Sequence, residues 1–193
     1  FGNEGSGKTY YFDDVSYGTE ASAPAPAPAS APTLITLDFD AGIPSDYSLI
    51  TFGGTVSTLD TTPPDGGSGT AAEVIKTDGA QTWAGVTFLS LASGEIIAPE
   101  SDTASMRVWA PEAGTVVRLK LEDVLSPTHS VETEATTLTS GWQTLNFDFK
   151  EEAAGTAAVN HSFEFNKASV FFDFGNAGTG ATYYLDNFKY SVI

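Results

Sequence analysis

The chain has 193 residues, of which 25 are acidic and 8 are basic, so its formal net charge is −17. This surplus of acid argues against nucleic acid and anionic membrane surfaces as partners, because both attract proteins through clustered Lys and Arg. The lack of cysteine excludes disulfide scaffolds and cysteine nucleophiles, and no run approaches the roughly 18 apolar residues of a membrane span, so no membrane insertion is expected.

The two ends of the chain carry the same motif. Residues 1–17 read FGNEGSGKTYYFDDVSY and residues 174–190 read FGNAGTGATYYLDNFKY, with ten of the seventeen aligned positions identical. We interpret residues 1–19 as the C-terminal hairpin of a preceding repeat, so that the chain holds one complete copy from a tandem array.

Residues 2–9, GNEGSGKT, also match the phosphate-binding pattern G-x-x-x-x-G-K-[ST]. That pattern needs a helix after the loop, whereas YYFDDVSY follows here and has the composition of a strand. In the second copy of the motif Ala181 replaces the lysine. The segment is therefore predicted to be a Gly-rich hairpin turn.

An Ala/Pro linker over residues 20–32 follows the first motif. It contains ASAPAPAPASAP at residues 21–32, and alternating Ala and Pro favour polyproline II, which would span roughly 37 Å as a semi-rigid spacer. Segments of this kind separate the modules of secreted proteins.

Short strands punctuated by Gly and Pro fill residues 33–193. Many alternate, as Val117, Leu119 and Leu121 do with the polar residues between them, and one apolar face per strand indicates antiparallel sheets packed on one another. We predict one complete all-β module, an antiparallel β-sandwich of the jelly-roll, galactose-binding type. A single helix is expected at residues 151–159. The predicted strands are 34–39, 55–59, 71–76, 83–89, 104–110, 116–122, 129–135, 142–149, 168–174 and 182–191.

Two of these strands carry polar residues on their non-core faces. Arg107 and Trp109 share one side of the first, and Arg118, Lys120 and Glu122 share one side of the next. If the strands pair, the five residues form one aromatic and basic surface that suits a sugar, with Trp83 as a second stacking platform. In the alternative, the bases pair with neighbouring acids and Trp109 packs under a loop. Trp142 opens an alternating strand and is expected in the core.

The sequence offers little for catalysis. Neither a nucleophile motif nor a paired-His metal spacing is present, and a retaining glycosidase would need two carboxylates about 5 Å apart. Glu132 and Glu134, on one strand face, are the only pair to test. No enzymatic activity is expected.

A cation site is predicted from three carboxylates. Asp38 and Asp40 lie on one face of the first strand, and Asp186 lies in the last. First and last strands are often neighbours in jelly rolls, and three clustered carboxylates suit a structural calcium ion. In the alternative, they are surface acids that repel one another without an ion.

Several segments resemble those of β-sandwich carbohydrate-binding modules, which recur in tandem in secreted polysaccharide-degrading proteins of marine and related bacteria. They are LDFD, QTWAGVTF, MRVWAPEAGTVVRLKLED, VETEATT, GWQTLNFDF and FFDFGNAGTGATYYLDNF. The resemblance covers residues 33–193. It implies a non-catalytic module with a structural calcium at Asp40 and Asp186, where usually only one acid of the first strand serves, and a sugar site on the concave face or at the loop tips.

Two functions remain open at this point. In the first, the chain is an extracellular carbohydrate-binding module in a tandem array, with polysaccharide as its partner. In the second, it is a structural repeat of a secreted filament, adhesin or surface fibre, in which neighbouring copies of the module pair their strands. Both place the protein outside the cell or on its surface.

Overall fold

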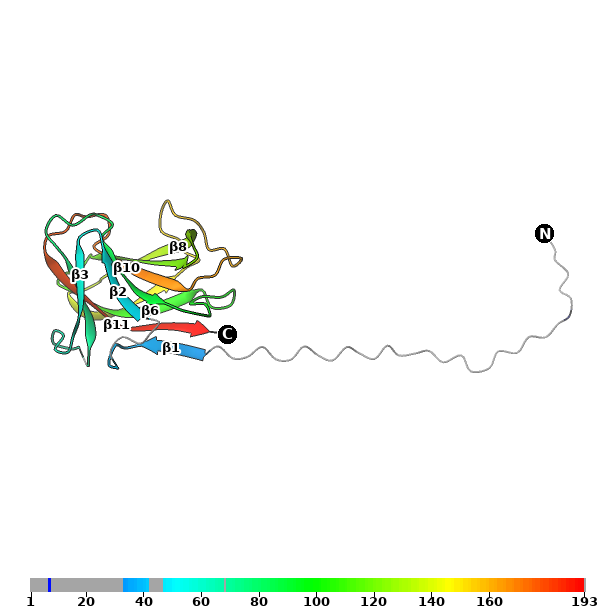
Figure 1. The fold of residues 1–193 in the computed structure, drawn as a ribbon, viewed down its shortest axis with the longest axis horizontal. Helices are drawn as coiled ribbons and strands as arrows, with labels where there is room; N and C mark the ends of the chain where they lie inside the picture. Colours follow the sequence, from blue (N-terminus) through cyan, green and yellow to red (C-terminus); the bar gives the residue numbers. More distant parts are fainter. Residues whose placement is uncertain (1–6, 8–32, 42–46, 68, 193) are drawn as a thin grey trace. The chain divides into compact units, whose positions relative to one another are not determined.

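Two antiparallel β-sheets face each other in the computed structural model, which describes residues 7, 33–41, 47–67 and 69–192 (Figure 1). Sheet A has the order β3 (Thr55–Asp60), β4 (Ala71–Lys76), β11 (Ala181–Val192), β6 (Thr103–Ala110) and β9 (Gly141–Asp148), with β1 (Thr33–Leu37) paired to β11. Sheet B has the order β2 (Tyr47–Phe52), β5 (Gly85–Ser90), β10 (Lys167–Phe172), β7 (Val116–Asp123) and β8 (Ser126–Thr136).

The prediction of an all-β antiparallel sandwich is confirmed, and each predicted strand overlaps an observed one. β2 was not predicted, and the helix expected at residues 151–159 is wrong. Thr133 forms a β-bridge with Glu152, and the Ala153 amide donates to the carbonyl of Glu132. These bonds hold the start of that segment against β8 in place of a helix. The predicted repeat fragment and linker, residues 1–32, lie outside the described residues except for Gly7.

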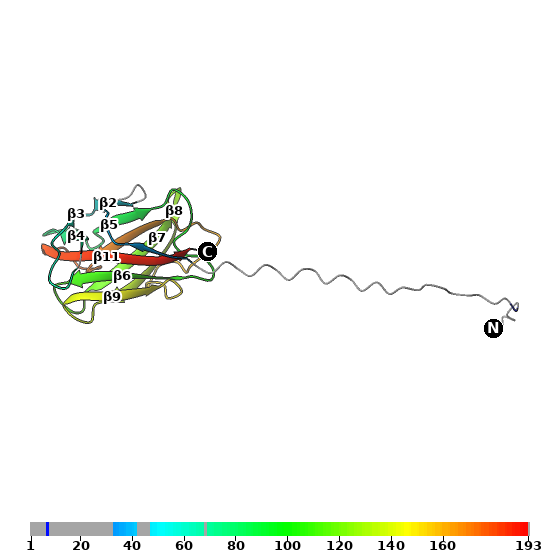
Figure 2. The ribbon, with the colours of Figure 1, turned by 90° about the horizontal axis from the view of Figure 1, so that it is seen from below.

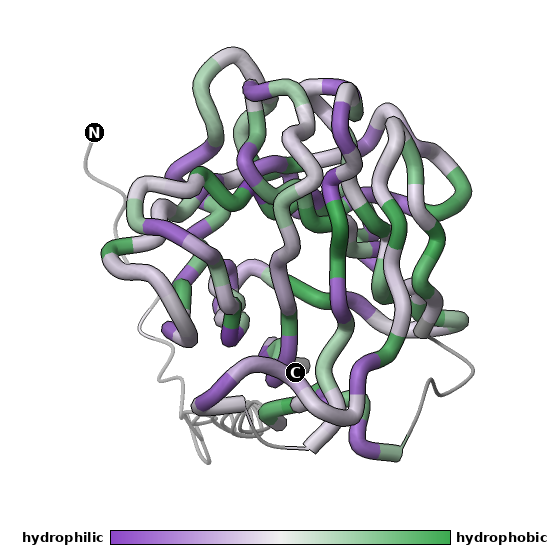
Figure 3. The backbone as a smooth tube through the Cα atoms, turned by 90° about the vertical axis from the view of Figure 1, so that its left-hand side faces the viewer, coloured by the Kyte–Doolittle hydropathy of each residue, from purple (hydrophilic) through white to green (hydrophobic). Residues whose placement is uncertain are grey.

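The core lies between the sheets and is built from the inward side of each alternating strand. Hydrophobic and hydrophilic residues follow one another along the strands in Figure 3. Val117, Leu119 and Leu121 on β7 are fully buried. Two aromatic contacts join the sheets: Phe88 meets Phe188 edge-on with ring centroids 5.0 Å apart, and Phe172 stacks on Tyr183 at 4.9 Å. Each fully buried side chain contributes about 1.5–3 kcal/mol, so this interior stabilises the sandwich.

At one end of the sandwich, the loop between β10 and β11 lies along the turn after β4. The Gly178 amide donates to the carbonyl of Ala80, the Gly79 amide donates to the carbonyl of Gly178, and the Gly180 amide donates to the carbonyl of Lys76. These bonds tie the start of β11 to its neighbour. No helix that could cross a membrane occurs in the part of the chain that the structure describes.

Candidate functional site

The predicted single polar surface is wrong, because β6 and β7 do not pair. β6 lies between β11 and β9 in sheet A, whereas β7 lies between β10 and β8 in sheet B (Figure 2). Arg107 and Trp109 therefore face outward on sheet A, and Arg118, Lys120 and Glu122 face outward on sheet B. The predicted residues form two groups on opposite faces of the sandwich.

On sheet B, β10 adds a second row of outward side chains beside those of β7. In the register of these strands, Lys167 pairs with Glu122, Ser169 with Lys120 and Phe171 with Arg118. On the other side of β10, Ser169 lies opposite Thr87 of β5. Polar side chains from three strands thus meet on one surface.

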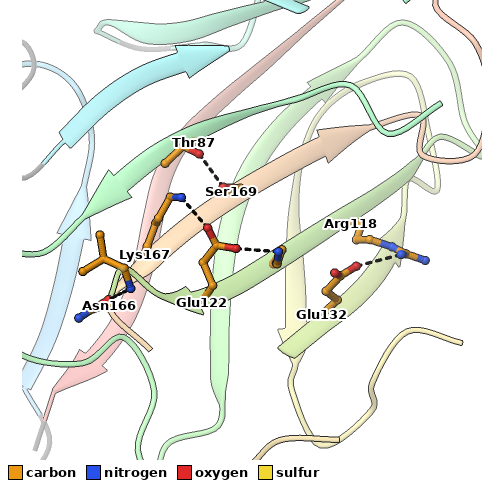
Figure 4. A network of polar contacts seen from close by, with 9 residues as sticks. Thr87, Arg118, Glu122, Glu132, Asn166, Lys167 and Ser169 are labelled. Atoms are coloured by element: carbon orange, nitrogen blue, oxygen red, sulfur yellow. Dashed lines mark hydrogen bonds and ion pairs between the residues drawn. The ribbon is translucent and has the colours of Figure 1, made fainter. Parts of the chain in front are cut away.

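Glu122 lies at the centre of this surface, bound by two lysines (Figure 4). Lys120 Nζ lies 2.6 Å from one of its oxygens and Lys167 Nζ lies 2.5 Å from the other. Burial raises the pKa of Glu122, but the hydrogen bonds from both lysines outweigh burial and hold the pKa below its usual value. The carboxylate therefore stays ionised at neutral pH and fixes the lysine heads in place.

Arg118 closes one side of the network. Its guanidinium contacts Glu132 at 2.9 Å and Glu134 at 2.6 Å, and it lies 3.6 Å above the ring of Phe174. Glu132 and Glu134, the pair singled out for a glycosidase, are therefore both ion-paired with one arginine. The positive charges of this surface balance its negative charges. The bases are Arg118, Lys120 and Lys167, and the acids are Glu122, Glu132 and Glu134.

Aromatic side chains form the other end, over β2 and β5. Trp83 is 49% exposed and stacks on Phe52 at 6.3 Å, and Phe52 meets Phe171 edge-on at 5.5 Å. Gly85 makes room for these rings, because a Cβ there would lie 2.9 Å from the ring of Phe171 and 3.0 Å from that of Phe52. The exposed face of Trp83 and the ion-paired groups of Lys120, Glu122 and Lys167 therefore belong to one surface.

The aromatic end and the Glu122 network together line a groove of about 400 Å³, which we call the sheet B groove. Its volume falls in the range of small-molecule sites, and it combines apolar rings with convergent donors and acceptors. Three of the predicted residues, Trp83, Lys120 and Glu122, line it. Sequence reasoning missed the others, although the alternation of KASVFF already places Lys167, Ser169 and Phe171 on one side of a strand. The groove is lined by Ile50, Phe52, Trp83, Thr87, Lys120, Glu122, Lys167, Ser169 and Phe171.

On sheet A, Arg107 and Trp109 belong to an aromatic cluster. Trp109 meets Tyr184 edge-on at 5.8 Å, and Arg107 lies 4.8 Å above the ring of Trp142. The residues between β3 and β4 cover part of it: Trp142 Nε1 donates to the carbonyl of Pro64 at 3.0 Å and Arg107 Nη2 donates to that of Gly66. The expectation that Trp142 lies in the core is wrong, because its ring faces outward and is half-buried.

The three predicted calcium ligands are placed differently from one another. The Asp186 carboxylate is 1% exposed and accepts hydrogen bonds from Asn187 N and Nδ2. Burial raises the pKa of Asp186 to about 6, and the charge of Asp40 adds to the effect. Asp40 Oδ1 accepts from Thr70 N, whereas Asp38 Oδ1 accepts from Asp40 N in a local turn.

Within the described residues, no three acidic or His side chains gather as a metal site. The charge of Asp40 acts on the Asp186 carboxylate, and the calcium site at Asp38, Asp40 and Asp186 stays a prediction. An ion there would neutralise a buried carboxylate that another carboxylate destabilises.

No family model matches the sequence, and no curated protein matches it. Among solved structures, a mutant family 29 carbohydrate-binding module complexed with mannohexaose matches with a TM-score of 0.56 and 17% identity, over 83% of this chain and 92% of that one. The chain has the fold of these modules. A second mutant module, complexed with cellulohexaose, matches at 0.55 and 17% identity, over 83% and 91%. A further family 29 module matches at 0.56 and 16%, over 83% and 89%.

Proposed function

We propose that the chain is a non-catalytic carbohydrate-binding module that holds polysaccharide in the sheet B groove. The observation that carries this proposal is the exposed ring of Trp83 beside the Lys120–Glu122–Lys167 network. Aromatic faces stack on the C–H groups of sugar rings, and fixed charged heads form hydrogen bonds with hydroxyls. The neighbours complexed with mannohexaose and cellulohexaose support a sugar chain as the ligand.

The charges of sheet B favour a neutral chain over an acidic one. Arg118, Lys120 and Lys167 face an equal number of glutamates across the ion pairs, and the whole protein carries a net charge of −17. A uronate chain would meet no net positive field, whereas neutral glucans and mannans need none.

Replacing Trp83 by Ala is expected to weaken polysaccharide binding about 10- to 100-fold, because the change removes an exposed aromatic face from the groove. Affinity electrophoresis against soluble glucans, mannans, alginate and ulvan measures this change. Leu125→Ala is the matched control, since Leu125 is 88% exposed and lies in the turn between β7 and β8. Equal retardation of Trp83→Ala and wild type, or no retardation by any glycan, would contradict the proposal.

We further propose that the module is one repeat of a tandem array. The residues shared by the two motifs have defined roles in the complete copy: Tyr183 and Tyr190 lie in the core and Asp186 is buried. Gly7 corresponds to Gly180, and both have positive φ, at 61° and 82°. The first motif thus has the residues needed to end an equivalent module.

Deleting residues 1–32 is expected to change the free energy of unfolding by less than about 0.5 kcal/mol, because residues 31–193 form one compact unit and substitutions or deletions outside such a unit cost little. Thermal unfolding of the full chain and of residues 33–193 tests this. A fall of several degrees in the shortened chain would show that residues 1–32 belong to the same folding unit.

The geometry of the chain ends favours an array of pendant modules over a filament. Thr33 and Val192 are register partners, so β1 begins and β11 stops at the same end of sheet A. Copies joined through neighbouring strand ends can project from one side of a connector, whereas ends on opposite sides would suit direct stacking. Electron microscopy of the parent protein would overturn this choice if it revealed filaments. Secretion is part of the proposal, and a parent protein found only inside cells would contradict it.

A structural calcium ion completes the proposal. It would be held by Asp40 and Asp186 and would relieve the burial of the second carboxylate. Its role would be to fix the first strand of the module against β11, away from the sheet B groove.

A further inference from the structure

A second groove lies on the outer face of sheet A, opposite to the sheet B groove. Its main part measures about 530 Å³, and a smaller hollow of about 120 Å³ shares Ser105 and Lys189 with it. It crosses β11, β6 and β9, which lie side by side in Figure 2. We call the two parts together the sheet A groove.

Polar side chains from the three strands form one row across this groove. Lys189 pairs in register with Ser105, and Ser105 pairs with Asn146. Thr103 and Asp148 form the next row toward the chain ends, and Arg107 and Thr144 form the next row in the other direction. Leu34 of β1, which is 60% exposed, gives one wall an apolar surface.

The polar groups of Lys189 and Asn146 differ from the lysines of sheet B because the described residues do not hold them in ion pairs or hydrogen bonds. Lys189 and Asn146 are exposed, and neither side chain forms an ion pair or a hydrogen bond with the part of the chain that the structure describes. By contrast, Lys120 and Lys167 are held by Glu122. An ammonium, an amide and a hydroxyl in one row offer both donors and acceptors, and the carboxylate of Asp148 stands in the adjacent row.

We propose that the sheet A groove is a second saccharide-binding site, so that one module holds two neutral polysaccharide chains on opposite faces. This inference rests on the proposed function and extends it from attachment to cross-linking. The volume falls in the range of ligand sites, and the lining of hydroxyl, amide and opposite charges suits sugar hydroxyls. Two sites on one rigid body join chains without any new contact between proteins.

The groove lies beside Leu34 of β1 and Ser191 of β11, at the end of sheet A where these strands begin and stop, so another copy of the module is the rival occupant. Two features favour sugar over protein. Each chain carries a net charge of −17, so copies repel one another. Charged and polar side chains, among them Lys189, Asn146 and Asp148, line the groove beside apolar ones, whereas the centres of protein interfaces are depleted in charged residues and enriched in aromatic ones.

The experiment is an NMR titration of the isotope-labelled full chain with mannohexaose and, separately, cellulohexaose. Chemical-shift changes are followed on both sheets, because this measurement detects binding even at millimolar Kd. The variants are Lys189→Ala with Asn146→Ala in sheet A, and Trp83→Ala with Lys120→Ala in sheet B. All four are surface changes, and an unchanged spectrum away from each face checks the fold.

The expected result is two independent sets of shifts, each weakened about tenfold or more by the variant pair on its own sheet and unchanged by the other pair. One set confined to sheet B would overturn the inference and leave the proposed function intact. One set confined to sheet A would overturn the sheet B assignment and also the inference of two sites, because the module would then hold a single chain in the sheet A groove. No shifts with either sugar would contradict both. Dimers in sedimentation that vanish in Lys189→Ala with Asn146→Ala would assign the groove to a protein contact and overturn the inference.

Discussion

Replacing Gly178 by Ala is expected to lower the free energy of unfolding by about 3–5 kcal/mol. A Cβ at this position would lie 2.0 Å from the carbonyl oxygen of Thr77 and 2.7 Å from Ala80 Cβ. Because the obstacle is backbone, the loop must move, and movement breaks the two hydrogen bonds between Gly178 and the turn at Gly79 and Ala80. Thermal unfolding should show a fall of roughly 10 °C.

Gly180→Ala is the matched control for this change. Gly180 lies two residues away in the same loop, has a φ of +82° and has no atom within 4 Å of a Cβ placed there. Only the backbone conformation opposes the new side chain, at a cost of about 1–2 kcal/mol. Equal losses in the two variants would show that packing at Gly178 is not the reason for glycine.

The same comparison explains why glycines recur in the N-terminal motif. Gly5 and Gly7 stand where the complete copy has Gly178 and Gly180. In the complete copy one glycine is required by space and the other by backbone conformation. The G-x-G pattern that imitates a phosphate loop is therefore a requirement of the turn into the last strand.

The sequence predicts the strands of this fold well because their inward side chains alternate without interruption. On β7, for example, the buried face must be the one that carries Val117, Leu119 and Leu121. β2 was missed because YSLITF has apolar residues at 47, 49, 50 and 52, which fit neither a period of two nor a helical period clearly. Its Phe52 contributes to the aromatic end of the sheet B groove.

The partners of the strands were harder to predict than the strands themselves. A short connection, residues 111–115, joins β6 to β7, and sequential strands usually lie side by side. Here the connection crosses from one sheet to the other. Alternation gives the face of each residue within its own strand, but it carries no information on which sheet the strand joins. The predicted site was therefore divided between two faces.

Replacing Asp186 by Asn is expected to stabilise the calcium-free module at pH 7 by about 1–3 kcal/mol. The folded pKa of Asp186 is raised to about 6 by burial, against an ordinary value of 3.8. A raised pKa means that the folded state binds its proton more tightly than the unfolded state. The contribution of this group to stability is therefore fully present below about pH 4 and is lost as the pH rises through about 6.

The asparagine keeps the shape and removes the buried charge. Its side-chain oxygen still accepts the hydrogen bond from the Asn187 amide, and Arg107 keeps its contacts with Gly66 and Trp142. In EDTA, the Asp186 carboxyl should make the wild type melt at a higher temperature at pH 5 than at pH 7. This difference between the two pH values should be smaller in Asp186→Asn.

Calcium should reverse the order of the melting temperatures of wild type and Asp186→Asn. An ion bound only to the folded state adds about 2.7 kcal/mol at a concentration of 100 Kd, and Asp186→Asn loses a ligand. Wild type should therefore melt higher in calcium than in EDTA, whereas Asp186→Asn should melt at the same temperature in both. Asp38→Asn is the control, because its carboxylate lies outside the proposed pair and only caps a local turn. If wild type gains nothing from calcium while Asp186→Asn is stabilised in EDTA, Asp186 is a buried carboxyl without an ion. If Asp186→Asn is instead less stable than wild type in EDTA, the polar groups around Asp186 are sufficient to stabilise its carboxylate without an ion.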